Sequence, residues 1–179
     1  MKNTTLWITR TAVFIALLIA WQAASAALGN QFVTGSGVNL ILIVSVMICG
    51  VASGSCVALV SPVMAKMFGI GPLWGLIPFI ALGNLAIVLV WHIVGNRTMG
   101  GKFTAYTVAA ASGAVAKFLT LYLGIVKLAI PVILKIPEPQ ATVMSGMFSI
   151  PQLITALIGG SLAVILLPTL KKVAGNKDK

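Results

Sequence analysis

The chain has 179 residues, of which 59% are hydrophobic and 8% are charged. Soluble domains carry about 25% charged residues, so this composition excludes a soluble globular protein. The net charge of +10 does not indicate nucleic-acid binding, because the lysines and arginines stand at the ends of apolar segments and are not interleaved with aromatic residues. The length suits a single domain of about six membrane helices.

Six apolar segments predict a compact all-α bundle of six transmembrane helices, in one domain over residues 1–179 with a short basic tail at 173–179. The predicted helices cover residues 6–28, 37–50, 52–68, 73–94, 104–125 and 145–170. The fifth is open to a short extension as far as residue 134. The second and third form either a tight helical hairpin or a partly broken pair. Glycines and prolines at 69–72 and 136–139 break the chain before the fourth and sixth helices.

The distribution of positive charge predicts the orientation of these helices. If both termini are cytoplasmic, the inner side carries Lys2, Arg10, Arg97, Lys102, Lys171, Lys172, Lys177 and Lys179, and the outer side carries Lys66, Lys127 and Lys135. Cytoplasmic loops are enriched in lysine and arginine, so this bias predicts a multi-pass protein of the cell membrane with both termini inside.

Groups that drive catalysis or coupled transport are scarce. The only acids are Glu138, in a predicted outer loop, and Asp178, near the end of the chain; His92 is the single histidine. The sequence contains no carboxylate pair, no nucleotide-binding loop and no metal-ligand spacing. We therefore expect neither an enzyme nor a metal or cofactor site. With no intramembrane acids to couple a proton gradient, the protein is either passive or powered by a partner.

Four alanines recur at every fourth position of the first predicted helix: Ala12, Ala16, Ala20 and Ala24. Residues four apart lie near one another on one helix face. Small residues on such a face let another helix approach closely in the membrane. This alanine strip is therefore a candidate docking surface for a partner helix.

Polar residues within the apolar segments gather toward the predicted outer half and form a candidate substrate site. The candidate residues are Trp21, Gln22, Thr34, Asn39, Asn84, Lys117, Thr120, Tyr122 and Gln152. The same half contains Ser25, Asn30, Gln31, Ser36, Trp74, Ser149 and Thr155.

Several candidates have a structural alternative. Trp21 is equally typical of an interfacial anchor, Asn84 of a bridge between helices, and Gln152 of a group that satisfies the backbone next to Pro151. Lys117 either binds a ligand, in which case a carboxylate, phosphate or carbonyl is favoured, or has a structural role, in which its ammonium extends toward the membrane surface or bonds to carbonyl oxygens of the protein.

The chain resembles the substrate-binding S components of energy-coupling factor (ECF) transporters. The resemblance lies in the six predicted helices, the alanine strip, the segment QFVTGS at 31–36, the segment PFIALGN at 78–84, and SIPQL at 149–153 leading to LLP at 166–168. It implies a protein that captures a vitamin or similar micronutrient in a pocket near the outer face.

The resemblance also implies partners. The alanine face would pack on a transmembrane coupling subunit, and two cytoplasmic ATPases would use ATP, so this chain itself would bind no cofactor. The substrate stays open, with a lean from Lys117 toward pantothenate or another ligand that carries a carboxylate or carbonyl. The alternatives are a self-sufficient small transporter and a structural subunit of a membrane complex.

Overall fold

The computed structural model describes residues 2–97 and 100–175, and within these ranges the chain contains helices and no strand. The elements in chain order are α1 Lys2–Ala26, α2 Gln31–Cys49, α3 Val51–Met67, the 3₁₀ turn η1 Trp74–Leu76, α4 Ile77–Gly95, α5 Lys102–Leu121, the π-helical segment η2 Tyr122–Ile133, α6 Gln140–Met147 and α7 Ile150–Gly175. The predicted all-α architecture of six main helices is confirmed, with α6 as a short addition.

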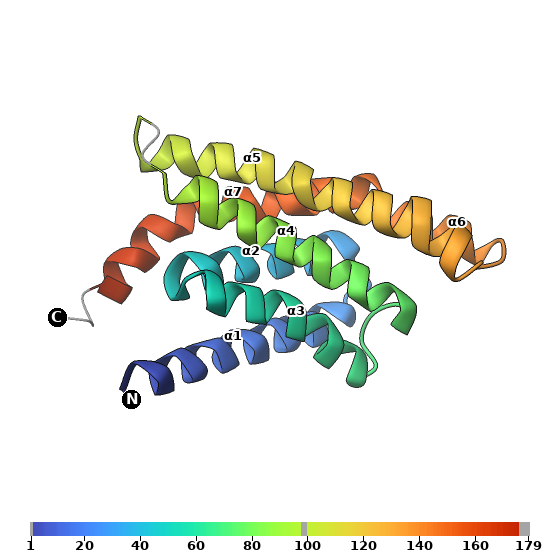
Figure 1. Ribbon diagram of the computed structural model, residues 1–179, viewed down its shortest axis with the longest axis horizontal. Helices are drawn as coiled ribbons and strands as arrows, with labels where there is room; N and C mark the ends of the chain where they lie inside the picture. Colours follow the sequence, from blue (N-terminus) through green and yellow to red (C-terminus); the bar gives the residue numbers. More distant parts are fainter. Residues whose placement is uncertain (1, 98–99, 176–179) are drawn as a thin grey trace.

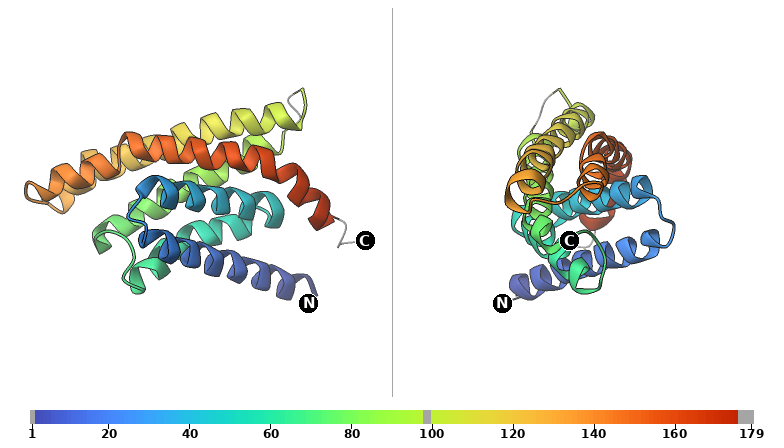
Figure 2. Two further views of the ribbon diagram at one scale, coloured as in Figure 1. Left: turned by 180° about the vertical axis from the view of Figure 1, so that it is seen from behind. Right: turned by 90° about the vertical axis from the view of Figure 1, so that its right-hand side faces the viewer.

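The main helices run lengthwise through an elongated molecule, and the two termini lie at one end, with α6 at the other (Figure 1). Helix α2 is the most central element, because it packs against α1, α3, α4 and α7. Helix α1 lies at the edge of the bundle, as the end-on view in Figure 2 shows. Five segments in the described part of the chain are long and apolar enough to cross a membrane, and α3 is a shorter apolar helix.

Glycines allow the close helix contacts that hold the centre together. A Cβ atom on Gly159 of α7 would lie 2.6 Å from the carbonyl oxygen of Ser36 and 2.7 Å from the Cβ of Asn39, both on α2. A Cβ on Gly35 would lie 2.9 Å from the Cβ of Thr155 on α7. Only glycine permits these backbones to approach so closely, and the approach brings Thr155 beside Asn39.

The buried face of α1 repeats every seven residues, at Thr11, Leu18 and Ser25. Thr11 is fixed to α3 by a 2.5 Å hydrogen bond between its hydroxyl and that of Ser53. Seven residues make nearly two helical turns, so these side chains share one face. The alanine strip lies on the other side of the helix, and all four of its residues are exposed.

Several predicted helix boundaries are wrong at the end of the molecule that contains α6. Residues 31–36, predicted as a loop, form the first turns of α2, because Asn30 Oδ1 accepts hydrogen bonds from the backbone N–H groups of Phe32 (2.9 Å) and Val33 (3.4 Å). Such a side-chain cap favours a helix start at this point.

The predicted sixth helix is two helices, α6 and α7, with Phe148 and Ser149 between them. Pro151 lies in the first turn of α7, where proline is tolerated. Glu138 caps α6, since its Oε2 accepts hydrogen bonds from the hydroxyl (2.6 Å) and the N–H (3.2 Å) of Thr142. The predicted extension of the fifth helix is η2, which continues α5 to Ile133.

At its other end, α7 continues to Gly175, beyond the predicted end at residue 170, and residues 176–179 of the predicted tail lie outside the described part. Gly50 separates α2 from α3 with a positive φ of 87°, so the two helices are distinct.

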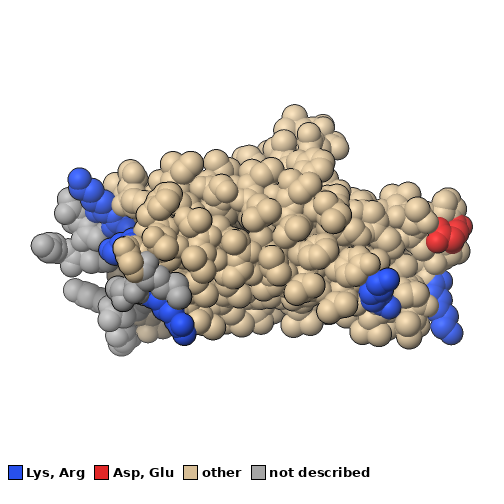
Figure 3. Space-filling view, turned by 90° about the horizontal axis from the view of Figure 1, so that it is seen from above, with Lys and Arg blue, Asp and Glu red and all other residues tan. Residues whose placement is uncertain are grey.

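Charged side chains gather at the two ends of the molecule on the face shown in Figure 3, and the long stretch between the ends carries none in that view. The exposed side chains along the helices are instead apolar, such as Leu82, Val115 and Ile165. An apolar band between two charged ends is the surface that a bilayer requires.

Candidate functional site

A cavity of about 360 Å³ opens at the end of the molecule opposite the termini. Its walls come from α1, α2, α3, α4, α5 and α7, and from the connections between α1 and α2, between α3 and η1, and between α6 and α7. The polar side chains on its walls belong to Gln22, Ser25, Asn30, Gln31, Thr34, Ser61, Asn84, Lys117 and Gln152. The volume lies within the usual range of pockets for small molecules.

Lys117 stands on the inner wall of this cavity with only 4% of its surface exposed. Its ammonium donates hydrogen bonds to Asn39 Oδ1 at 2.6 Å and to Asn84 Oδ1 at 2.8 Å. An ammonium has three N–H donors, so one remains for a group inside the cavity. The side chain therefore does not extend to the membrane surface, and it bonds to carbonyl oxygens of the protein as the structural alternative predicts. Its role in ligand binding stays a prediction.

No carboxylate of the described residues neutralises Lys117. Glu138, the only described acid, caps α6 through Thr142, and Asp178 lies outside the described part. A buried charge is costly unless it is paired or strongly hydrogen-bonded. The two amide oxygens supply part of that solvation, and an electron-rich or anionic group in the cavity would complete it.

A chain of hydrogen bonds fixes the amide of Asn39. Its Nδ2 donates to Thr155 Oγ1 at 3.5 Å, and Thr155 Oγ1 donates to the carbonyl oxygen of Gln152 at 3.1 Å. Asn39 and Thr155 are fully buried. Because its amide nitrogen faces Thr155, the oxygen of Asn39 is turned toward Lys117. Asn39 does not line the cavity itself and acts on it through Lys117.

Two buried polar atoms on the cavity wall have no hydrogen-bond partner: Gln22 Oε1 and Ser61 Oγ. Nearly all buried polar atoms in proteins are paired, so these two are unusual, but both are covered by neighbouring atoms and neither presents accessible surface to the cavity. Ser61 belongs to α3 and was not among the predicted residues. Its only sequence signal is its place before Pro62 in an otherwise apolar stretch.

At the mouth of the cavity, two glutamines from different helices donate hydrogen bonds to one backbone carbonyl oxygen. Gln31 Nε2 donates to the carbonyl oxygen of Met147 at 2.6 Å, and Gln152 Nε2 donates to the same oxygen at 3.1 Å. These bonds tie the start of α2 and the start of α7 to the end of α6. Gln152 therefore does satisfy backbone near the break before Pro151, and it also lines the cavity.

The structure brings together some predicted site residues and leaves others outside. Gln22, Thr34, Asn84, Lys117 and Gln152 line the cavity, whereas Trp21, Thr120 and Tyr122 do not. Thr120 donates its hydroxyl proton to the carbonyl oxygen of Ala116 at 2.8 Å. The Tyr122 ring stacks on Phe118 and lies under the Lys127 ammonium. The cavity-facing partner of Lys117 along the helix is Leu121, four residues on, whereas Tyr122 points well away from that face.

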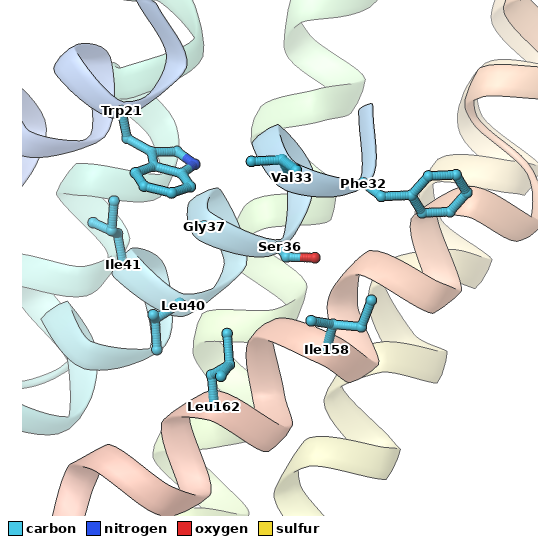
Figure 4. Close-up of a pocket in the computed structure, with 9 residues that line it drawn as sticks. All are labelled: Trp21, Phe32, Val33, Ser36, Gly37, Leu40, Ile41, Ile158 and Leu162. Carbon is cyan, nitrogen blue, oxygen red and sulfur yellow. The ribbon is translucent and has the colours of Figure 1, made fainter. Parts of the chain in front are cut away.

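Trp21 lines a different depression, an apolar groove of about 380 Å³ between α1, α2 and α7. In Figure 4 its ring lies beside Gly37 of α2, and Ile158 and Leu162 of α7 form the far wall. A Cβ on Gly37 would meet the indole ring at 2.0 Å, so the glycine makes room for it. The indole N–H donates to the carbonyl oxygen of Thr34 at 3.2 Å, so Trp21 fixes the segment that carries Thr34.

Comparison of the chain with protein-family models, curated proteins and solved structures gave no match.

Proposed function

We propose that this protein is a membrane-embedded binding subunit that captures a small water-soluble molecule, as the S components of ECF transporters do. The ligand is a vitamin or similar micronutrient that carries a carboxylate or an electron-rich carbonyl. A partner transmembrane subunit and two ATPases supply the energy for its delivery into the cell. The chain itself has no catalytic role and binds no cofactor.

The observation that carries this proposal is the uncompensated ammonium of Lys117 on the wall of a cavity of about 360 Å³. A buried cation held by two neutral amides has one free donor for a ligand acceptor. Gln22, Thr34 and Gln152 add neutral polar side chains to the same wall. Together they provide one positive and several neutral polar groups, which suits a small molecule with an acidic or carbonyl end and several hydroxyl or amide groups.

A membrane location is supported by the apolar helices and by the charges at the ends of the molecule. The two termini lie at the same end, as an even number of crossings requires. The end that carries Arg10, Arg97, Lys102, Lys171 and Lys172 is richer in positive charge, which favours the cytoplasmic side of a bacterial cell membrane. The cavity then opens to the outside.

The docking role of α1 is supported by the exposure of the alanine strip and the marginal place of this helix in the bundle. A lipid-facing helix needs no small side chains, whereas a helix that receives another helix does. The absence of acids inside the described helices fits a protein that takes its energy from a partner.

The test is mass spectrometry of the small molecules released by denaturing the purified, detergent-solubilised protein. We expect one micronutrient with a carboxylate or carbonyl group, in an amount close to that of the protein. If none is released, calorimetric titration with a panel of water-soluble vitamins follows, with pantothenate as the first probe. Absence of both a released ligand and micromolar binding would refute the proposal.

A further inference from the structure

A second depression lies at the opposite end of the molecule, between the start of α5 and the end of α7. It has a volume of about 360 Å³ and is lined by Lys102, Phe103, Tyr106, Val164, Pro168, Lys171 and Lys172. Three lysines therefore surround one hollow, which the proposed ligand-capture role does not use. The end of the molecule that carries the termini contains this hollow.

The positive charge of this hollow has no described counter-ion. The only described acid, Glu138, lies between η2 and α6, at the far end of the molecule. Asp178 lies outside the described residues. The hollow therefore favours a negatively charged occupant.

Two further features direct this charge into the hollow. The Lys171 ammonium lies 5.5 Å from the centre of the Tyr106 ring, which orients it across the gap between α7 and α5. Helix α5 begins at Lys102 with no capping side chain at Gly101, so the positive end of its dipole lies beside the lysines.

The rest of the lining is apolar, which distinguishes the hollow from a site for a soluble ion. Val164 and Pro168 form the α7 side, and Phe103 on α5 is 72% exposed. The hollow thus combines three lysines with an apolar lining at one end of the molecule. An occupant that satisfies both parts has an anionic head and a hydrocarbon tail.

We propose that this hollow binds the phosphate headgroup of an anionic membrane phospholipid, with an acyl chain running along the apolar surface of α5 and α7. Basic pockets between helices at the cytoplasmic side are typical of such sites. The occupant is a lipid of the leaflet that faces the termini. This inference rests on the membrane location of the protein and is independent of ligand capture at Lys117.

The experiment is native mass spectrometry of the full-length protein, extracted from vesicles with equal amounts of phosphatidylglycerol and phosphatidylcholine of the same acyl chains. We expect the protein to retain phosphatidylglycerol preferentially. The triple variant Lys102→Gln, Lys171→Gln and Lys172→Gln is expected to lose that preference by roughly tenfold or more, since each lysine near a membrane surface contributes about a fivefold gain in affinity.

The matched control variant replaces three lysines at the other end of the molecule, as Lys66→Gln, Lys127→Gln and Lys135→Gln. We expect this variant to keep its preference for phosphatidylglycerol. A second triple variant, with arginine at 102, 171 and 172, preserves the positive charge, and we expect it to keep the preference for phosphatidylglycerol. The comparison distinguishes an effect of lost charge from an effect of lost folding. Equal retention of the two lipids by the wild type, or an unchanged preference in the glutamine variant, would overturn the proposal. Displacement of the lipid by millimolar inorganic phosphate would do the same, since it would indicate a site for a soluble anion.

Discussion

Replacing Lys117 with methionine tests the chemistry of the candidate site directly. Methionine keeps most of the length and apolar volume of the lysine side chain but removes its charge and its donors. In the structure the ammonium has one N–H left for a ligand, after the bonds to Asn39 and Asn84. The substitution therefore removes one charge-assisted hydrogen bond to the ligand.

A hydrogen bond to a charged group contributes about 1.5–3 kcal/mol, and each 1.4 kcal/mol corresponds to about a tenfold change in affinity. We therefore expect Lys117→Met to weaken binding of a carboxylate ligand by at least about tenfold. The measurement is calorimetric titration of the detergent-solubilised protein with the ligand identified by mass spectrometry. The Lys127→Met variant is the control, because Lys127 is an exposed lysine of the same continuous helix, away from the cavity.

Weaker binding by the variant could come from lost folding or from lost charge, and titration with a second, uncharged ligand distinguishes the two. Lys117→Met leaves the oxygens of Asn39 and Asn84 without their donor, at a cost of about 1–3 kcal/mol, but it also removes a buried charge. An analogue in which the carboxylate is replaced by an alcohol or amide gains less from the ammonium, so its affinity should change little. Equal affinity of wild type and variant for the carboxylate ligand would refute the role of Lys117.

The remaining predictions concern the network, the packing and the docking face. Asn84→Asp places a carboxylate 2.8 Å from the ammonium, and this internal anion should weaken binding of an anionic ligand by roughly tenfold in the same titration. Gly159→Ala forces a Cβ against α2, and should destabilise the protein by about 1–3 kcal/mol in thermal unfolding followed by circular dichroism. Ala16→Trp with Ala20→Trp should abolish co-purification with a coupling subunit and its ATPases while ligand affinity stays unchanged.

Each of these changes has a matched control. The neutral variant Asn84→Ser removes the amide without adding a charge, so it separates lost solvation of Lys117 from a new ion pair. A Cβ on Gly146 of α6 meets nothing within 4 Å, so Gly146→Ala should not destabilise the protein. Ala111 is an exposed alanine of α5, and Ala111→Trp should leave the complex intact. If the α1 double variant still co-purified with the coupling subunit and its ATPases, the alanine strip would not be the docking surface.

The sequence predicts the helices well, because their apolar stretches are long and are separated by glycine and proline. It fails at residues 31–36, which are predicted as a loop that contains Gly35 and ends before Gly37, although the helix begins at Gln31. These glycines instead allow tertiary contacts: Gly35 packs on Thr155, and Gly37 packs on Trp21. A glycine that admits a neighbouring helix and a glycine that breaks a helix look alike until the partner is known.

The sequence also identifies the central groups of the candidate site, because Lys117, Asn39 and Asn84 are rare polar residues within strongly apolar helices. It does not determine which face of each helix points inward. Thr120 and Tyr122 belong to the same predicted outer half as Lys117, but the residue that lines the cavity beside Lys117 is Leu121. Ser61 was missed for the converse reason, since a single serine in a helix is unremarkable unless its burial is known.

The residues that pack α7 against α2 also position the hydrogen-bond partner of Lys117 beside the cavity. Gly159 lets α7 approach α2, the approach brings Thr155 to the amide nitrogen of Asn39, and that contact turns the amide oxygen toward Lys117. A site assembled in this way depends on three helices being in place at once. An anionic ligand that pairs with the ammonium would therefore stabilise the contact between α2, α5 and α7 and not only occupy the space between them.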